Sequence, residues 1–203
     1  MKNLLITPFL FINKYKKIVF GINQEWYSFA ENNGFNLIIA NNLKELKEIL
    51  KLDIRGLILS GGNDVVSVKN NKINSIRELN EIKIINYVIS KKIPIIGICR
   101  GFQLFSKLNG SKLINVKNHQ NCNHRIFVKK NKLINNKSIS TNSFHRIGIK
   151  KLNNEFEIIG KTRDENIEIV INKKKNFLGL MFHPERKNID QKPINILIKK
   201  FIS

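Results

Sequence analysis

The chain has 203 residues, 42% of them hydrophobic, and carries 36 Lys and Arg against 15 Asp and Glu, a formal charge of +21. This length and apolar content suit a single domain over residues 1–203 with a sizeable core. The two cysteines, Cys99 and Cys122, exclude a dense disulfide scaffold and fit a cytoplasmic protein. No apolar run reaches about 18 residues, so we expect neither a membrane helix nor a membrane partner.

The positive charge allows three interpretations. A surplus of Lys and Arg is typical of nucleic-acid binders. Here the lysines are scattered, no aromatic residues are interleaved with them, and Asn and Ile are also frequent, which favours a compositional bias. We therefore expect no nucleic-acid partner, while attraction of an anionic small substrate by the overall field stays open.

Strands and helices alternate in the first half of the chain. Such alternation predicts a parallel sheet covered on both faces, with ligands at the carboxyl ends of the strands. The predicted elements are a strand at 4–7, a polar and aromatic loop at 8–23, a helix at 24–33, a strand at 35–40, a helix at 43–50, a strand at 56–59, a helix at 76–90, a strand at 93–98 and a helix up to 108.

Short β-prone runs separated by Asn, Lys and Gly fill the second half. They predict an antiparallel extension together with strands that return to the main sheet, closed by a last helix at 193–201. The runs lie at 112–116, 125–128, 138–141, 147–149, 157–161, 167–171 and 177–181.

The junction after the strand 93–98 carries a candidate nucleophile. From Gly97 to Gly101 the sequence reads Gly-Ile-Cys-Arg-Gly, which has the form Gly-x-nucleophile-x-Gly. In this form a sharp strand-to-helix turn lifts the nucleophile out of the sheet, and the start of the helix favours a thiolate. Cys99 is the candidate nucleophile; the alternative is that it is a small buried hydrophobe.

A cysteine nucleophile needs a base and a group that orients the base. His183 follows the last predicted strand, and Glu185 lies two residues on, on the same face of an extended segment. The alternative is a surface histidine beside a surface glutamate. An oxyanion would need backbone N–H donors, which Arg100 and Gly62 can offer, although an ordinary tight turn also explains the two glycines at 61–62.

The other three histidines have less specific settings. His119 and His124 flank Cys122 in a polar segment. We favour a surface loop over a metal site, because no second Cys/His pair at zinc spacing occurs, and we expect no metal. His145 is expected to order a loop or to line the pocket.

Three motifs occur in order along the chain: Leu-Ile-Leu-Ser-Gly-Gly-Asn-Asp-Val at 57–65, Gly-Ile-Cys-Arg-Gly-Phe-Gln-Leu at 97–104 and His-Pro-Glu at 183–185. Together they resemble the signatures of class I glutamine amidotransferases, over nearly the whole chain. The resemblance implies a three-layer α/β/α flavodoxin-like fold with a mostly parallel central sheet and a small antiparallel extension. It implies an enzyme whose Cys99 attacks a γ-glutamyl carbonyl to form a thioester that water hydrolyses.

The resemblance also implies roles for the site residues. His183 would be general base and then acid, oriented by Glu185, and the amides of Gly62 and Arg100 would form the oxyanion hole. Four further positions match substrate-binding segments of the family: Gln103, Asn142, Ser143 and Phe144. No cofactor is implied, and the partner is a small γ-glutamyl substrate.

The Cys-Arg-Gly-x-Gln form is more similar to the γ-glutamyl hydrolase branch than to subunits that pass ammonia to a synthase. Within that branch, residues 24–29, 34–35 and 41–42 look like those of γ-glutamyl-CDP-amidate hydrolases, which release cytidine diphosphoramidate from CDP-glutamine in capsular polysaccharide modification. The alternatives are a γ-glutamyl-γ-aminobutyrate-type hydrolase and a glutaminase subunit that delivers ammonia to a synthase. The oligomeric state is left open.

Overall fold

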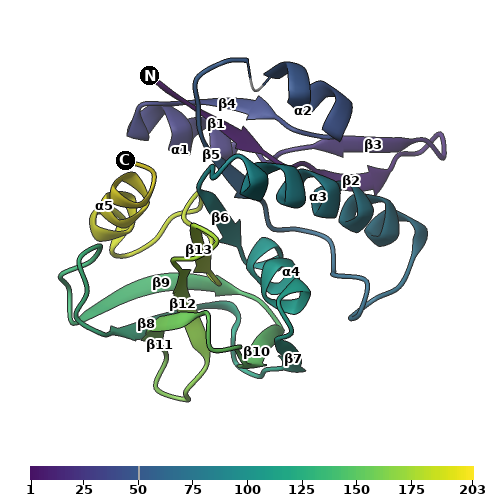
Figure 1. Cartoon of the computed structure of the whole chain (residues 1–203). Coiled ribbons are helices and arrows are strands. Elements are labelled where there is room, and N and C mark those ends of the chain that lie inside the picture. Colours follow the sequence, from purple (N-terminus) through teal and green to yellow (C-terminus); the bar gives the residue numbers. More distant parts are fainter. Residues whose placement is uncertain (50) are drawn as a thin grey trace.

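The computed structural model describes residues 1–49 and 51–203. Within these residues one nine-stranded sheet runs in the order β4-β1-β5-β6-β13-β12-β11-β8-β9 (Figure 1). The strands of its parallel part are β4 (Phe35–Ile39), β1 (Lys2–Ile6), β5 (Ile54–Leu59), β6 (Ile95–Ile98) and β13 (Phe177–Leu180). The antiparallel part consists of β12 (Ile167–Asn172), β11 (Glu157–Lys161), β8 (Gln120–Val128) and β9 (Ser138–Phe144).

Helices cover both faces of the parallel part. Leu4 and Ile6 of β1 pack in the core under α1 (Glu25–Asn33) and α5 (Gln191–Phe201), whereas Leu5 faces the other core. That second core lies under α2 (Leu43–Ile49), α3 (Lys72–Ser90) and α4 (Arg100–Leu108). Because both faces are buried, the strands read as continuous apolar runs. The predicted three-layer α/β/α fold is confirmed.

The second half forms the predicted antiparallel extension. Every predicted β-prone run corresponds to a strand, although the runs at 112–116 and 177–181 each extend one residue past the strand's end. Strand β13 returns to pair in parallel with β6. Two of the strands, β7 (Lys112–Asn115) and β10 (Ile147–Lys151), pair with each other in a separate antiparallel sheet. Among the helices of the described chain, none is long and apolar enough to cross a membrane.

Residues 8–23 were wrongly predicted as a loop. They form a hairpin, in which β2 (Phe9–Ile12) pairs antiparallel with β3 (Ile18–Gly21). Apart from the buried Leu10, the hairpin's apolar residues are partly exposed, and its sequence lacks the clean alternation that marks a half-buried strand. The helix predicted from 76 begins earlier, at Lys72, because the Asn71 side chain caps it. Leu50, the predicted end of the helix at 43–50, lies outside the described residues.

Candidate active site

Cys99 sits on a strained turn between β6 and α4. Its φ of 48° lies in the left-handed region, which non-glycine residues rarely adopt. A Cβ on Gly97 would lie 2.8 Å from the backbone nitrogen of Phe102, and one on Gly101 would lie 2.1 Å from the carbonyl oxygen of Leu59. Both glycines are therefore needed for α4 to pack this closely on β5 and β6, and this packing sets the position of Cys99.

His183 and Glu185 lie where β13 ends. The Nδ1 atom of His183 is 2.7 Å from Oε1 of Glu185, and both side chains are buried. The expected same-face arrangement of these two residues is thus present in the structure. A carboxylate can only accept a hydrogen bond, so Nδ1 carries the hydrogen and Nε2 is left for chemistry.

The surroundings of His183 favour its charged form. Burial opposes the charge, but the attraction of the Glu185 carboxylate and hydrogen bonds with Cys99 and Glu185 outweigh it and raise the pKa of His183 to about 10. At neutral pH the ring is therefore an imidazolium that already holds the proton a leaving group would need.

The Gly61–Gly62 turn at the end of β5 meets the histidine directly. A Cβ on Gly61 would lie 2.6 Å from Cε1 of His183, so only glycine leaves room for the ring. Gly62 has a φ of 74°, which glycine adopts without strain. The turn is thus fitted to His183 and is more specific than an ordinary tight turn.

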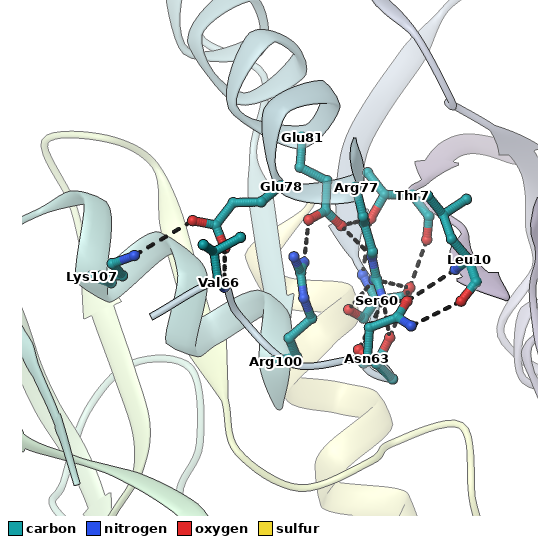
Figure 2. Close-up of polar contacts among 12 residues, drawn as sticks. Thr7, Leu10, Ser60, Asn63, Val66, Arg77, Glu78, Glu81, Arg100 and Lys107 are labelled. Carbon is teal, nitrogen blue, oxygen red and sulfur yellow. Dashed lines mark hydrogen bonds and ion pairs between the residues drawn. The ribbon is translucent and has the colours of Figure 1, made fainter. Parts of the chain in front are cut away.

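Arg77 of α3 holds this turn through its guanidinium. Figure 2 shows its guanidinium pointing from the helix into the loop. Its Nη1 donates to the carbonyls of Gly61 (3.0 Å) and Gly62 (2.8 Å), and its Nη2 donates to the carbonyl of Ser60 (2.8 Å). Because a trans peptide is planar, a Gly61 carbonyl that faces Arg77 makes the N–H of Gly62 point away from Arg77.

Glu81 ties this support to α4, the helix that begins directly after Cys99. Its Oε1 accepts from Nε of Arg77 (3.0 Å) and from the Thr7 hydroxyl (2.8 Å), and its Oε2 pairs with Nη1 of Arg100 (Figure 2). Burial raises the pKa of this carboxyl, but the charges of Arg100 and Arg77 outweigh burial and lower it. The end of β1, the Gly61–Gly62 turn and the start of α4 are therefore joined through one buried carboxylate.

Arg77 and Glu81 were not predicted as functional residues. Both are almost fully buried and share the inner face of α3 with Ile84, Ile85 and Val88. The available signal was helical spacing: Arg77 and Glu81 are four residues apart, and Ile84 and Ile85 follow at three and four residues. Charged residues at such positions face the core and need partners.

The four residues expected to bind substrate lie in two places. Gln103 is in α4, where its Nε2 donates to the carbonyl of Ile147 (3.0 Å). The other three, Asn142, Ser143 and Phe144, end β9 beside His183.

Asn142 engages the backbone of His183 with both ends of its amide. Its Nδ2 donates to the His183 carbonyl (2.8 Å), and its Oδ1 accepts from the His183 N–H (2.9 Å). The Ser143 hydroxyl donates to the carbonyl of His119 (2.7 Å). In this arrangement the Asn142 side chain positions the histidine.

Phe144 is the most exposed of the four. Its ring meets the His183 ring edge to face, with centroids 5.8 Å apart, and the Arg186 guanidinium lies 4.5 Å above it. A cavity of about 210 Å³ opens beside His183. Its walls include Gly61, Gly62 and Arg186, with Phe9 and Trp26 among the apolar residues.

The prediction of a surface loop for His119 and His124 was wrong, because His119 directly precedes β8 and His124 lies within this strand. His119 and His145 are buried, His124 is half-buried, and all three face Glu168 of β12. Cys122 points elsewhere, with its thiol donating to the carbonyl of Asn118. The expectation that His145 orders a loop agrees with the contact of its Nδ1 with the Ile147 carbonyl (3.2 Å).

The class I glutamine amidotransferase family model matches residues 15–202, and the chain belongs to this family. Among curated relatives, the γ-glutamyl-CDP-amidate hydrolase of Campylobacter jejuni is 36% identical over 135 residues. That match covers 66% of this chain and 64% of the relative, just under two thirds of its length. One component of the glutamine-hydrolysing GMP synthase of Methanococcus maripaludis is 28% identical over 167 residues, 80% of each chain.

Solved structures agree on the fold. A glutamine amidotransferase from Thermotoga maritima superposes with a TM-score of 0.75 at 14% identity, over 100% of this chain and 98% of that one. PurLQS from the same organism gives a TM-score of 0.71 at 19% identity, over 99% and 97%. At such identities the likeness supports the fold alone.

Proposed function

We propose that the chain is a hydrolase of γ-glutamyl amides that uses Cys99 as its nucleophile. The supporting observation is the convergence of three groups at the carboxyl ends of β5, β6 and β13. These groups are the Gly61–Gly62 turn, the strained Cys99 and the His183–Glu185 pair. Nucleophile, base with orienting carboxylate, and oxyanion donors are what acyl transfer to a cysteine requires.

In the first half of the reaction, Cys99, with its thiol proton held by His183, attacks the γ-carbonyl carbon of the substrate through its thiolate sulfur. The negative charge that develops on the carbonyl oxygen is met by the backbone N–H groups of Gly62 and Arg100. When the carbon–nitrogen bond breaks, His183 gives its proton to the leaving nitrogen, and the glutamyl group remains on Cys99 as a thioester.

In the second half, water attacks the thioester while His183 takes one of its protons. The carbon–sulfur bond breaks, and glutamate leaves. Glu185 stabilises each imidazolium state, and Asn142 holds the histidine backbone. Gln103 and Phe144 are the proposed contacts for the glutamyl group.

The proposed substrate is CDP-glutamine, and the proposed product besides glutamate is cytidine diphosphoramidate for capsular polysaccharide modification. The support is the similarity to the Campylobacter jejuni hydrolase together with the Arg186 guanidinium at the wall of the cavity. A guanidinium over an aromatic ring suits a diphosphate and a base next to each other. The overall charge of +21 would attract such an anion.

A panel of amides tests the reaction. Glutamate release is measured from CDP-glutamine, γ-glutamyl-aminobutyrate and glutamine without any added protein. We expect release from CDP-glutamine, complete loss in Cys99→Ala and normal turnover in the matched control Cys122→Ala. Turnover retained by Cys99→Ala would refute the proposed nucleophile.

A second comparison tests the leaving group. Arg186→Gln is expected to raise KM for CDP-glutamine about tenfold, as for a lost charge-assisted contact, and to leave KM for γ-glutamyl-aminobutyrate unchanged. Arg163→Gln is the control, because Arg163 is exposed and outside the cavity walls. Equal effects of Arg186→Gln on both substrates would contradict a nucleotide-linked leaving group.

The second candidate is a glutaminase that serves a synthase, which the similarity to the GMP synthase component favours. Such a protein would release little glutamate by itself and would need a synthase partner. Efficient glutamine hydrolysis only after addition of a synthase, with no release from CDP-glutamine, would favour this candidate over the first.

A further inference from the structure

Four side chains with metal-binding atoms meet inside the antiparallel part of the sheet. His119 directly precedes β8, His124 lies within β8, His145 directly follows β9, and Glu168 lies in β12. Glu168 has no exposed surface, and His119 and His145 are each 3% exposed. The group lies outside the walls of the proposed active-site cavity.

The ring nitrogens approach the Glu168 carboxylate at distances that are long for hydrogen bonds. Nδ1 of His119 is 3.6 Å and Nε2 of His145 is 3.3 Å from Oε1, and Nε2 of His124 is 3.5 Å from Oε2. Zinc binds nitrogen and oxygen at about 2.0–2.2 Å in a tetrahedron, which separates neighbouring ligand atoms by about 3.3 Å. One ligand atom from each of His119, His145 and Glu168 fits within a span of 4.8 Å.

Outer contacts fix which ring nitrogens carry hydrogen. Nε2 of His119 lies 3.0 Å from the Asp164 carboxylate, which can only accept, so this nitrogen is the donor. The Asn166 amide nitrogen lies 3.0 Å from the same ring atom but donates to Asp164 (2.7 Å). Nδ1 of His145 lies 3.2 Å from the carbonyl of Ile147 and donates to it.

In a neutral tautomer with its hydrogen on the outer nitrogen, each ring turns a lone pair toward Glu168. With their hydrogens on the outer nitrogens, Nδ1 of His119 and Nε2 of His145 both face the acceptor Oε1. Neither nitrogen, and neither oxygen of Glu168, has a hydrogen-bond partner among residues 1–49 and 51–203. Buried acceptors that face one another repel, and they have lost the water that would hydrate them. A cation between them would offset both costs.

We propose that this cluster binds a divalent transition-metal ion, zinc by its donor set. Nδ1 of His119, Nε2 of His145 and Oε1 of Glu168 are the proposed ligands, with Nε2 of His124 beside them as the fourth. Imidazole and carboxylate donors suit zinc, and the partners behind His119 and His145 are the carboxylate and carbonyl that metal-bound histidines usually have.

A metal was not expected from the sequence, because the chain has no second Cys/His pair at zinc spacing. The structure instead brings His145 and Glu168 to His119 from other strands, and it leaves Cys122 out.

The proposed role of the ion is structural. It would hold together the segment before β8, the turn after β9 and strand β12. Two backbone carbonyls link these segments to the proposed active site: the His119 carbonyl accepts from Ser143, and the Ile147 carbonyl accepts from both Gln103 and His145. A closed four-ligand site leaves no open position for substrate, as in other structural zinc sites.

The first test measures metal and not activity. The full chain is expressed in zinc-supplemented medium, purified without chelator, and analysed by plasma mass spectrometry. We expect an equimolar amount of zinc. Removal with EDTA is expected to lower Tm by several degrees, and zinc alone should restore it. A metal-free chain whose Tm does not respond to zinc would overturn the proposal and leave the cluster as a buried proton network.

Variants sharpen the test. Glu168→Gln is expected to abolish zinc binding, whereas Cys122→Ser, on the same strand as His124, should keep equimolar zinc. Asp164 is largely exposed, so Asp164→Ala should fold and weaken zinc affinity about 10–100-fold through the lost outer contact. Unchanged zinc content and affinity in both Glu168→Gln and Asp164→Ala would refute the assigned ligands.

Discussion

Glu81 and Glu168 are both almost fully buried carboxylates, but their surroundings differ. Glu81 is 2% exposed and is met by donors: Arg77, Arg100 and the Thr7 hydroxyl. Glu168 is 0% exposed, and the groups nearest to its oxygens are ring nitrogens at 3.3–3.6 Å. Glu81 accepts hydrogen bonds from these donors, whereas neither oxygen of Glu168 has a hydrogen-bond partner in the part of the chain that the structure describes.

The difference shows that burial alone does not reveal what a charged group is for. Around Glu81 two of the three donors are arginine cations, so the carboxylate holds parts of the proposed active site in place. Around Glu168 the neighbours are groups that bind either a proton or a metal. Glu185 lies between these cases, because one oxygen meets a histidine at 2.7 Å and the other has no partner in the described part of the chain.

The largest expected effect is that of removing Glu81. Glu81→Ala leaves two buried arginines without their anion and should lower the free energy of unfolding by about 3–5 kcal/mol. Urea denaturation measures it. Glu48→Ala is the matched control, because its pair with Lys51 is exposed and worth about 0–1 kcal/mol. Equal losses for the two variants would mean that the buried carboxylate has no special role.

The pairing of Glu185 with His183 leads us to expect that the stability of the folded chain depends on pH. The folded pKa of His183, about 10, exceeds the ordinary value of 6.5, so the imidazolium stabilises the folded chain fully below pH 6.5. This contribution is lost as the pH rises through 10, and it amounts to about 3 kcal/mol between neutral pH and pH 10.

NMR titration of the His183 ring checks the shift directly, and urea denaturation at each pH checks the stability. Glu185→Gln should lower the pKa of His183 because it removes the attracting charge. A titration midpoint near 6.5 in the unmutated chain would contradict the prediction.

A milder change beside Glu81, Arg77→Lys, separates an effect on stability from an effect on catalysis. Arg77→Lys keeps a cation near Glu81 but cannot bond the carboxylate and the loop carbonyls together. We expect kcat to fall about 100-fold, as when an oxyanion donor is lost, with little change in KM. Arg55→Lys, at an exposed pair with Asp53, is the control. An unchanged kcat in Arg77→Lys would show that the Gly61–Gly62 turn keeps its shape without this support.

The smallest effect is expected at Glu168 when zinc has been removed. In EDTA, Glu168→Gln should alter the free energy of unfolding by no more than about 1 kcal/mol, because a carboxamide can donate to a ring nitrogen. With zinc present the unmutated chain should be clearly the more stable of the two. Urea denaturation of both proteins in EDTA and in zinc measures this. A large loss in EDTA would place Glu168 in the same class as Glu81.

Much of the fold was predictable because the parallel strands are continuous apolar runs. The run ending at Ile98, with glycines on both sides of Cys99, predicted the strand, the turn and the helix in their correct places. The hairpin of β2 and β3 was missed, since its short strands pair mainly with each other and carry partly exposed apolar residues.

The surroundings of Glu81 and of Glu168 were less predictable from the sequence. Arg77 and Glu81 fell on an apolar stripe, a signal that spacing alone could have revealed. The meeting of His119 with His145 depends on the register of β8 against β9, which pairs Gln120 with Phe144. Glu168 comes from a third strand, β12, whose position must also be known. Such a register follows from turn geometry and packing over the whole sheet, so no local sequence pattern predicts it.

At Cys99, the residue that would be best for stability differs from the residue that the proposed chemistry needs. A non-glycine residue at a φ of 48° is strained by about 1–3 kcal/mol, and alanine would retain that strain, whereas glycine would release it. Cys99→Gly should therefore resist urea better than Cys99→Ala, the reverse of the usual order beside a helix. The backbone at this position is least strained with glycine, which cannot react, so selection for stability alone would remove the proposed nucleophile.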